Sequence, residues 1–322
     1  MLTAFETTLY NGLKQWHIPC LFEYMRNLIT LMLLAFSQLF AYGQNENDST
    51  SRVDSLPTVD SVTIATADSS PVKVRTYNLK PAVDIPLTAI GTGWSLYAFT
   101  EIYNKDKTPE EVILSLDKQD IPAFDRHGAD VYHPEADEIG DLIFYSSMPL
   151  PLFLLFDKKV RRDGLKVALL YLESMSVTGL LYTSAVYFAD RYRPYAYNDK
   201  APMSERTRGG AKNSFFAGHV ALVGTSTFFM AKILNDYHPD WKARWLPFTL
   251  AGAITATTGY LRYRGGQHFL SDILLGTAVG TLSGILVPHA HKNKNIADQR
   301  ISFTASYMGD TPQFGIVYKF IK

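Results

Sequence analysis

The sequence predicts an all-α protein, a helical bundle embedded in a membrane and followed by a short C-terminal β-hairpin. Six apolar segments account for the bundle, and they lie at residues 84–103, 141–157, 165–189, 216–234, 245–263 and 269–287. Several of them approach the roughly 20 residues with which a helix crosses a bilayer. Glycine, serine and threonine recur within them, and small residues let helices pack closely in lipid. Buried helices of a soluble protein are the alternative.

Residues 25–43 have the pattern of a secretory signal peptide. Arg26 precedes an apolar run over residues 28–40, and the small residue Gly43 suits a cleavage site. Residues 1–24 do not resemble a targeting segment, and we interpret them as a non-native upstream extension. The sequence therefore predicts export of the chain that follows.

The mature chain is expected to begin with a linker and to lack cysteine. The single cysteine, Cys20, lies in the upstream extension, so neither a disulfide nor a cysteine metal site is expected. Residues 44–80 are rich in serine, threonine and aspartate without helical periodicity, which is typical of a flexible linker. The chain has 31 basic and 31 acidic residues, and this balance argues against a nucleic-acid partner.

Residues 81–295 form the expected helical domain. Its first apolar segment, residues 84–103, contains Pro86 and Gly91 and ends close to Glu101. We interpret this segment as a re-entrant or interfacial helix and the five later segments as membrane spans. This interpretation reconciles an exported linker with the charge pattern of the later loops.

Two loops between the expected spans are basic, at residues 157–163 and 242–244. Basic loops of membrane proteins remain on the cytoplasmic side. The loops at the other end of the spans would then face the periplasm from a bacterial inner membrane. A soluble periplasmic protein is the alternative location. Further along the chain, residues 296–322 contain two partly alternating runs, 301–307 and 314–320, which predict the hairpin.

One segment carries the strongest chemical signal: it reads RYRGGQHFLSD from Arg262 to Asp272. His268 and Asp272 are four residues apart and would share one face of a helix. A carboxylate bound to one ring nitrogen makes the other nitrogen more basic, as a nucleophile that attacks phosphorus requires. Arg262 can grip two phosphate oxygens, and Gly265 and Gly266 allow the backbone to bend it towards the histidine. A plain helical hydrogen-bonded pair is the alternative.

Two further segments support phosphate chemistry. Arg193 and Pro194 follow a long apolar stretch, and the proline ends the helix beside a second arginine. Gly218 and His219 open another apolar helix, so their amides lie at a helix N-terminus, where anions bind. A histidine there can also protonate a leaving oxygen.

In this order and spacing, the three segments resemble the signature of the type 2 phosphatidic acid phosphatase superfamily, which includes acid phosphatases and vanadium haloperoxidases. The resemblance covers roughly residues 140–290. It implies that His268 is the nucleophile, His219 the general acid and Asp272 the carboxylate that orients the nucleophile. It also implies phosphate binding by Arg193, Arg262 and the Gly218 amide, with neither a metal nor another cofactor.

The match to that signature is partial. Val186 stands where the family has a lysine, Phe216 and Ala217 where it has Pro-Ser, and Leu261 where it has a serine. The candidates to replace the lost charge are Arg191, Arg206, Arg208 and Lys212. We expect Val186→Lys to place an ammonium beside Arg193 and to tighten phosphate binding.

The resemblance and the apolar helices together predict an envelope phosphatase. Its substrate would be a lipid-linked phosphate monoester or pyrophosphate, and its partners the membrane lipids. A catalytically impaired lipid-phosphate-binding or scaffold protein is one alternative. A vanadate-dependent haloperoxidase is another.

Overall fold

The computed structural model describes residues 76–293, 301–308 and 311–318. The upstream extension, the predicted signal peptide and nearly all of the predicted linker lie outside these residues.

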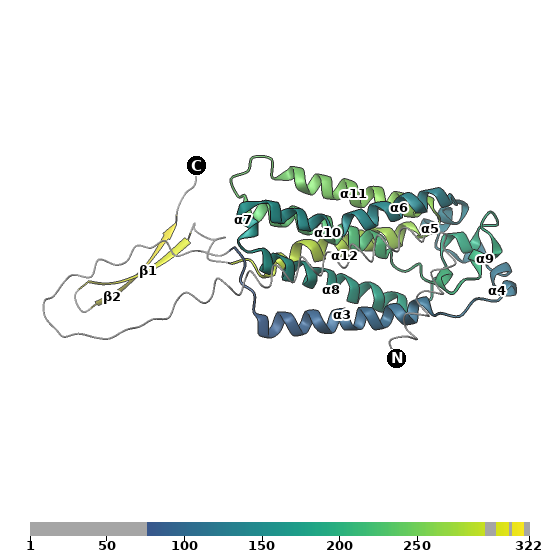
Figure 1. Cartoon of the computed structure of the whole chain (residues 1–322), viewed down its shortest axis with the longest axis horizontal. Helices are drawn as coiled ribbons and strands as arrows, with labels where there is room; N and C mark the ends of the chain where they lie inside the picture. The colour runs from purple at the N-terminus through teal and green to yellow at the C-terminus, as the bar shows by residue number, and fades with distance from the viewer. Residues whose placement is uncertain (1–75, 294–300, 309–310, 319–322) are drawn as a thin grey trace. The chain divides into compact units, whose positions relative to one another are not determined.

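Helices dominate the described chain, as the sequence predicts (Figure 1). The α-helices are α3 (Pro81–Tyr103), α4 (Glu110–Leu114), α5 (Ala123–Arg126), α6 (Pro134–Ser147), α7 (Lys158–Arg161), α8 (Gly164–Phe188), α9 (Met203–Arg206), α10 (Gly218–Tyr237), α11 (Trp245–Arg264) and α12 (Leu270–Ala290). The 3-10 helices are η1 (Lys118–Asp120), η2 (His127–Asp130), η3 (Leu150–Phe156), η4 (Pro194–Tyr197) and η5 (Gly209–Lys212).

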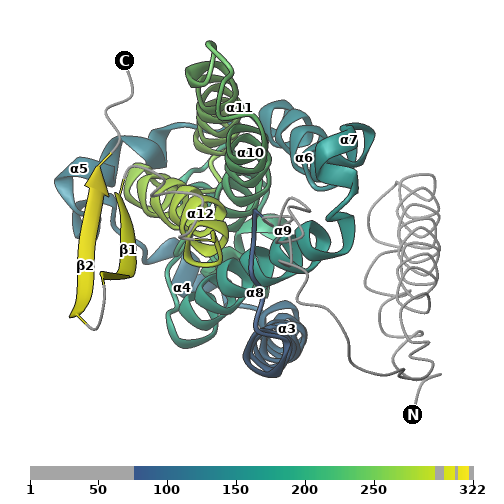
Figure 2. The same ribbon diagram turned by 90° about the vertical axis from the view of Figure 1, so that its left-hand side faces the viewer.

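Helix α10 lies in the middle of the bundle, with α6, α8, α11 and α12 packed around it (Figure 2). Its interior position explains its composition. Ser226 and Thr225 are fully buried, and their hydroxyls hydrogen bond to groups on neighbouring helices or within α10 itself. A helix surrounded by other helices can carry such polar groups because the bundle supplies their partners.

The helix that the sequence predicts at residues 141–157 is divided in two. α6 begins at Pro134, which occupies the first helical position, where a missing N–H costs nothing. Pro149 and Pro151 follow its end, and the chain continues as the 3-10 helix η3. Proline in a helix interior removes a hydrogen bond and clashes with the preceding turn, so the α-helical pattern stops before this pair.

Helix α3 is one continuous helix of 23 residues that packs along α8 (Figure 1). No re-entrant turn interrupts it within Pro81–Tyr103, although Pro86 lies inside the helix. Pro86 is in the second turn, where the loss of one hydrogen bond leaves the rest of the helix intact. Residues 84–103 thus belong to a continuous helix. Their placement as a re-entrant or interfacial segment of a membrane stays a prediction.

Three described segments are long and apolar enough to cross a membrane: 134–156, which combines α6 and η3, then α8 and α12. Large apolar side chains on their outer faces are exposed, among them Phe156, Phe188 and Leu142. The described part of the chain thus has the character of a membrane protein.

The helices give the bundle two distinct ends. One end carries α7 and the start of α3, since Tyr77 packs in one cluster with Val160 and Tyr237. The other end carries the start of α10 and the start of α12, with the loops after α8 and α11. All residues of the candidate site lie at this second end.

Two strands, β1 (Ile301–Met308) and β2 (Thr311–Tyr318), pair antiparallel, from Ile301 opposite Tyr318 to Met308 opposite Thr311. They follow residues 294–300, which are not described. That this hairpin is an accessory part of the helical domain therefore stays a prediction.

Candidate active site

Backbone hydrogen bonds join the three motif segments that the sequence singles out. Arg193 donates its N–H to the carbonyl of Ala211, at 2.7 Å, ahead of α10. Tyr195 donates to the carbonyl of Gly266, at 3.0 Å, and Ala217 to the carbonyl of Asp272, at 3.1 Å. Backbone hydrogen bonds thereby hold the third motif against each of the other two.

Gly266 and Gly218 occupy positions at which a Cβ atom would be strained or would collide with a neighbouring group. Gly266 has a φ of 69°, in the left-handed region that favours glycine. A Cβ there would also approach the carbonyl oxygen of Val131 to 2.9 Å. A Cβ on Gly218, the first residue of α10, would collide with the ring of Tyr182. The open amide end of α10 thus depends on glycine.

His268 is almost completely buried and has a defined tautomer. Its Nδ1 lies 2.7 Å from the carbonyl oxygen of Ser214. Because a carbonyl can only accept, Nδ1 carries the proton and Nε2 keeps its lone pair. Burial lowers the pKa of His268 well below its usual range, and the nearby guanidinium of Arg193 lowers it further. The ring is therefore neutral and nucleophilic at Nε2.

Asp272 contacts the loop that holds His268 and not the ring itself. Its Oδ2 accepts from the Ser214 hydroxyl at 2.7 Å and from the Phe269 N–H at 3.0 Å. His268 precedes α12, which begins at Leu270, so the helical spacing that predicts a direct pair does not apply. Asp272 instead acts on the imidazole through Ser214, whose carbonyl binds Nδ1.

Arg191 completes this buried cluster. Its guanidinium pairs with Asp272 and also with Asp125, the latter at 2.7 Å, and lies 4.5 Å above the ring centre of Phe269. Asp125 in turn accepts from the Ser271 N–H and hydroxyl at 2.9 and 2.6 Å. Arg191 therefore holds the start of α12, and its role as a replacement phosphate ligand stays a prediction.

Arg262 is buried, and both of its terminal nitrogens are paired with carboxylates of α6, those of Asp137 and Asp141. Its Nε has no hydrogen-bond partner among the described residues. Asp141 also lies 3.4 Å from Nε2 of His219, so one carboxylate serves both groups. An incoming phosphate would have to compete with these carboxylates for the arginine fork.

The two expected phosphate-binding arginines differ in their partners: Arg262 binds two carboxylates, whereas Arg193 binds a side-chain amide and a backbone carbonyl. Its Nη1 hydrogen bonds to the side chain of Gln267, and its Nε donates to the carbonyl of Gly210 at 3.1 Å. Gln267 also donates to Asp137 at 3.0 Å, which links Arg193 to the Arg262 carboxylates. Both arginines thus belong to one network with α6.

His219 lies in the first turn of α10, as the sequence predicts. Its ring packs against Phe144 with the ring centres 4.4 Å apart. Together with the Asp141 contact, this packing fixes the orientation of the imidazole at the amide end of the helix.

The departures from the family signature have structural explanations. Val186 and Ala217 are fully buried, and Val186 packs with Tyr182 and Phe216 in an apolar cluster. An ammonium does lie beside position 186, because Nζ of Lys105 donates to the Val186 carbonyl at 2.8 Å. Lys105 also pairs with Asp190 at 2.7 Å.

The remaining candidate cations lie on the loop between η4 and α10. Arg206 is buried and binds the Ala196 carbonyl and Asp199, so its role there is structural. Lys212 lies 4.0 Å from Asp190. Arg208, like Arg193, lies close enough to Tyr195 to oppose the rise in phenol pKa that burial causes.

Several residues of the site have no sequence signal that points to it. Asp137 and Asp141 are four residues apart in the first turns of α6, but they pair with an arginine more than 120 residues away. Ser214 acts through its carbonyl, which every residue has. Lys105 reaches the site from the end of α3. Only the tertiary structure brings these groups together.

The candidate site thus combines two histidines and two arginines at helix ends of an apolar bundle. Residues 167–296 match the model of the PAP2 superfamily. The resemblance that the motifs predict is confirmed over these residues.

A curated relative, the lipid A 4'-phosphatase of Porphyromonas gingivalis, is 29% identical over 140 residues. The aligned region covers 42% of this chain and 56% of the relative, so the match spans little more than half of that protein.

Two solved structures are similar in part. The PAP2 type phosphatidylglycerolphosphate phosphatase of Bacillus subtilis is 21% identical, with 66% of this chain and 98% of the other covered and a TM-score of 0.39. LpxE of Aquifex aeolicus is 21% identical, with 48% and 86% covered and a TM-score of 0.34.

Proposed function

We propose that this protein is a phosphatase that hydrolyses a lipid-linked phosphate monoester or pyrophosphate through a phosphohistidine intermediate. The observation that carries the proposal is the tautomer of His268. Its Nδ1–H is held by the Ser214 carbonyl, which leaves the Nε2 lone pair available for attack. His219, Arg193 and Arg262 belong to the same end of the bundle and to one connected network.

The reaction proceeds in two displacements. Nε2 of His268 attacks phosphorus, and the bond from phosphorus to the leaving oxygen breaks while His219 gives that oxygen a proton. Water then attacks the phosphohistidine, the P–N bond breaks, and His219 takes the proton that the water releases. Arg193, the Gly218 amide and Arg262 hold the phosphoryl oxygens.

A lipid substrate is supported by the apolar helices around the site and by the relative that is a lipid A 4'-phosphatase. The substrates to test first are therefore lipid A bearing a 4'-phosphate, phosphatidylglycerol phosphate and undecaprenyl pyrophosphate. The active site is proposed to face the periplasm.

The catalytically impaired alternative is favoured by one observation. Both terminal nitrogens of Arg262 are occupied by Asp137 and Asp141, and the family lysine is replaced by the buried Val186. Phosphate binding would then have to displace two carboxylates.

Turnover by single variants separates these functions. His268→Ala is expected to abolish phosphate release, because the intermediate cannot form without its nucleophile. His219→Ala should slow an alkyl phosphate by at least about a hundredfold and an activated aryl phosphate much less, since only the former requires a general acid. Purified protein and a phosphate-release assay suffice for both.

His127→Ala is the matched control, because this histidine is outside the network. If wild-type protein and His268→Ala release phosphate equally from every lipid tested, the scaffold alternative holds and the phosphatase proposal fails.

A further inference from the structure

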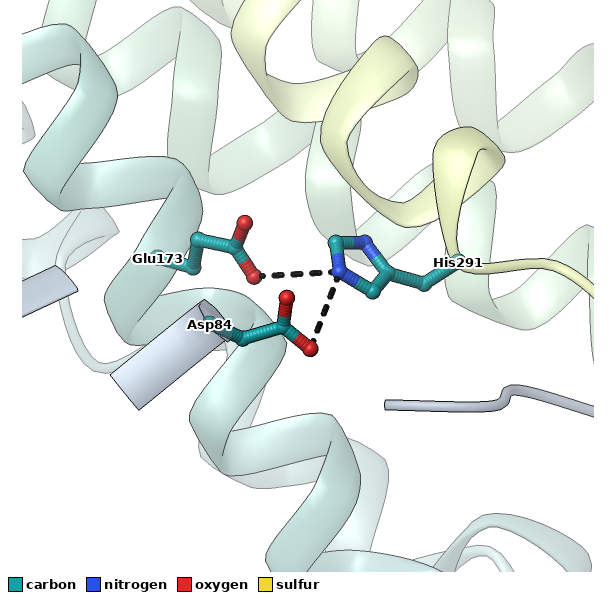
Figure 3. A group of neighbouring side chains, drawn as sticks. All are labelled: Asp84, Glu173 and His291. Carbon is teal, nitrogen blue, oxygen red and sulfur yellow. Dashed lines mark ion pairs between the residues drawn. The ribbon is translucent and has the colours of Figure 1, made fainter. Parts of the chain in front are cut away.

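Three ionisable side chains meet at the end of the bundle remote from the histidine pair. Asp84 comes from the first turn of α3, Glu173 from the middle of α8, and His291 from the residue that follows α12 (Figure 3). His291 and His268 lie at opposite ends of α12, which at 1.5 Å per residue separates them by about 30 Å. The cluster is therefore distinct from the phosphatase site.

The ligand atoms have the spacing of a metal site. Nε2 of His291 lies 3.3 Å from Oδ2 of Asp84 and 3.6 Å from Oε2 of Glu173. In a tetrahedral zinc site with bonds of about 2.0–2.2 Å, neighbouring ligand atoms are about 3.3–3.6 Å apart. The three atoms can thus occupy three corners of such a site with little movement, and the fourth corner is left for water.

Two ligands are already held in place by their neighbours. Nδ1 of His291 lies 2.9 Å from the carbonyl oxygen of Val287, so Nδ1 carries a proton, and Nε2 points at the carboxylates (Figure 3). Oδ2 of Asp84 accepts from the Lys80 N–H at 2.6 Å. Such outer contacts fix the tautomer and direction of metal ligands.

Glu173 supplies the independent evidence for a ligand. Its side chain is only 7% exposed, and its Oε2 has no hydrogen-bond partner in the described part of the chain. A buried carboxylate oxygen that accepts no hydrogen bond costs free energy, and the His291 nitrogen at 3.6 Å lies beyond hydrogen-bond distance. Around a bound metal, two carboxylates and one neutral imidazole would carry a charge of −2, which a divalent cation would balance.

A cavity gives access to the two carboxylates. It has a volume of about 410 Å³, and it is lined by Asp84 and Glu173 and by apolar or small side chains of α3 and α8. We propose that Asp84, Glu173 and His291 bind a first-row divalent metal ion, with Zn²⁺ the best fit for one nitrogen and two oxygens. The ion would tie α3 to α8 and to the end of α12.

Zinc binding to the whole chain tests the proposal. Tag-free protein in detergent is stripped with a chelator and desalted, and ZnCl₂ is then added. Bound zinc is measured by elemental mass spectrometry and stability by the midpoint of thermal unfolding. We expect one zinc per chain and a higher midpoint, with the affinity lowered at least about tenfold in Glu173→Gln and stoichiometric binding lost in His291→Ala.

His289→Ala is the matched control, because His289 is exposed, two residues from His291 and outside the cluster. It should bind zinc as the wild type does. Glu173→Gln keeps the shape of the side chain, so it remains informative if His291→Ala does not fold. Absence of retained zinc in the wild type, or equal retention by Glu173→Gln and wild type, would show that the cluster is only a protonated histidine between two carboxylates.

Discussion

At the scale of single residues, the chemistry depends on which atom binds Nδ1 of His268. The sequence places Asp272 four residues later, yet the acceptor is the Ser214 carbonyl. Asp272 binds the hydroxyl of the same serine, so it positions the histidine through one intermediate residue. A change at Asp272 would consequently disturb both the loop before α10 and the start of α12.

The low pKa of His268 makes stability depend on pH. Burial and Arg193 hold its pKa in the folded protein well below the value of 6.5 for a free side chain. Near pH 6, His268 therefore binds a proton in the unfolded chain but not in the folded chain. Stability due to this group is complete above about pH 6.5 and falls as the pH drops, by up to about 1.4 kcal/mol per pH unit.

Thermal unfolding from pH 7.5 to pH 5 checks this. We expect the midpoint of wild-type protein to fall on acidification, and that of His268→Gln to fall less, because glutamine does not titrate. Equal pH dependence of the two proteins would mean that His268 is not buried in its neutral form.

At the scale of an element, α8 determines what position 186 can do. The sequence analysis expects Val186→Lys to restore an anion ligand, but Val186 is fully buried in an apolar cluster with Tyr182 and Phe216. An ammonium buried among these side chains would lose its hydration without gaining a partner.

We therefore expect Val186→Lys to lower the free energy of unfolding by at least about 2 kcal/mol, without tighter inhibition by phosphate or vanadate. Val186→Met is the control, because it adds similar length without charge and separates overpacking from desolvation. Tighter inhibition in a stable Val186→Lys protein would show that the side chain reaches the anion pocket and that the cluster rearranges.

At the scale of the whole molecule, the position of α3 links two predictions made from the sequence. One is the cleaved signal peptide, and the other is the side of the membrane that the active site faces. The start of α3 lies at the same end of the bundle as α7, the basic helix. If a cleaved signal peptide exported residues 44–80, that basic end would also be outside and the histidines would face the cytoplasm. If the bundle crosses the membrane end to end, cleavage of residues 25–43 and a periplasmic active site are therefore alternative predictions.

Cysteine labelling in intact spheroplasts decides the orientation. In a Cys20→Ser background, an impermeant thiol reagent should label Lys200→Cys, beside the active site, but neither Lys159→Cys nor Lys80→Cys. All three positions are exposed. Labelling of Lys159→Cys and Lys80→Cys instead would reverse the orientation, and labelling of only one of these two would contradict the path of α3.

The sequence by itself determined the helical class, five of the six predicted helix positions and the motif residues, because apolar periodicity, proline and glycine act locally along the chain. Arg193, His219 and His268 could be found in this way since their motifs carry fixed spacings. The tertiary structure decided which partners these residues meet. Asp137 and Asp141 reach Arg262, Ser214 holds His268, and three distant helices bring Asp84, Glu173 and His291 together. Such contacts depend on helix packing, which no local pattern encodes.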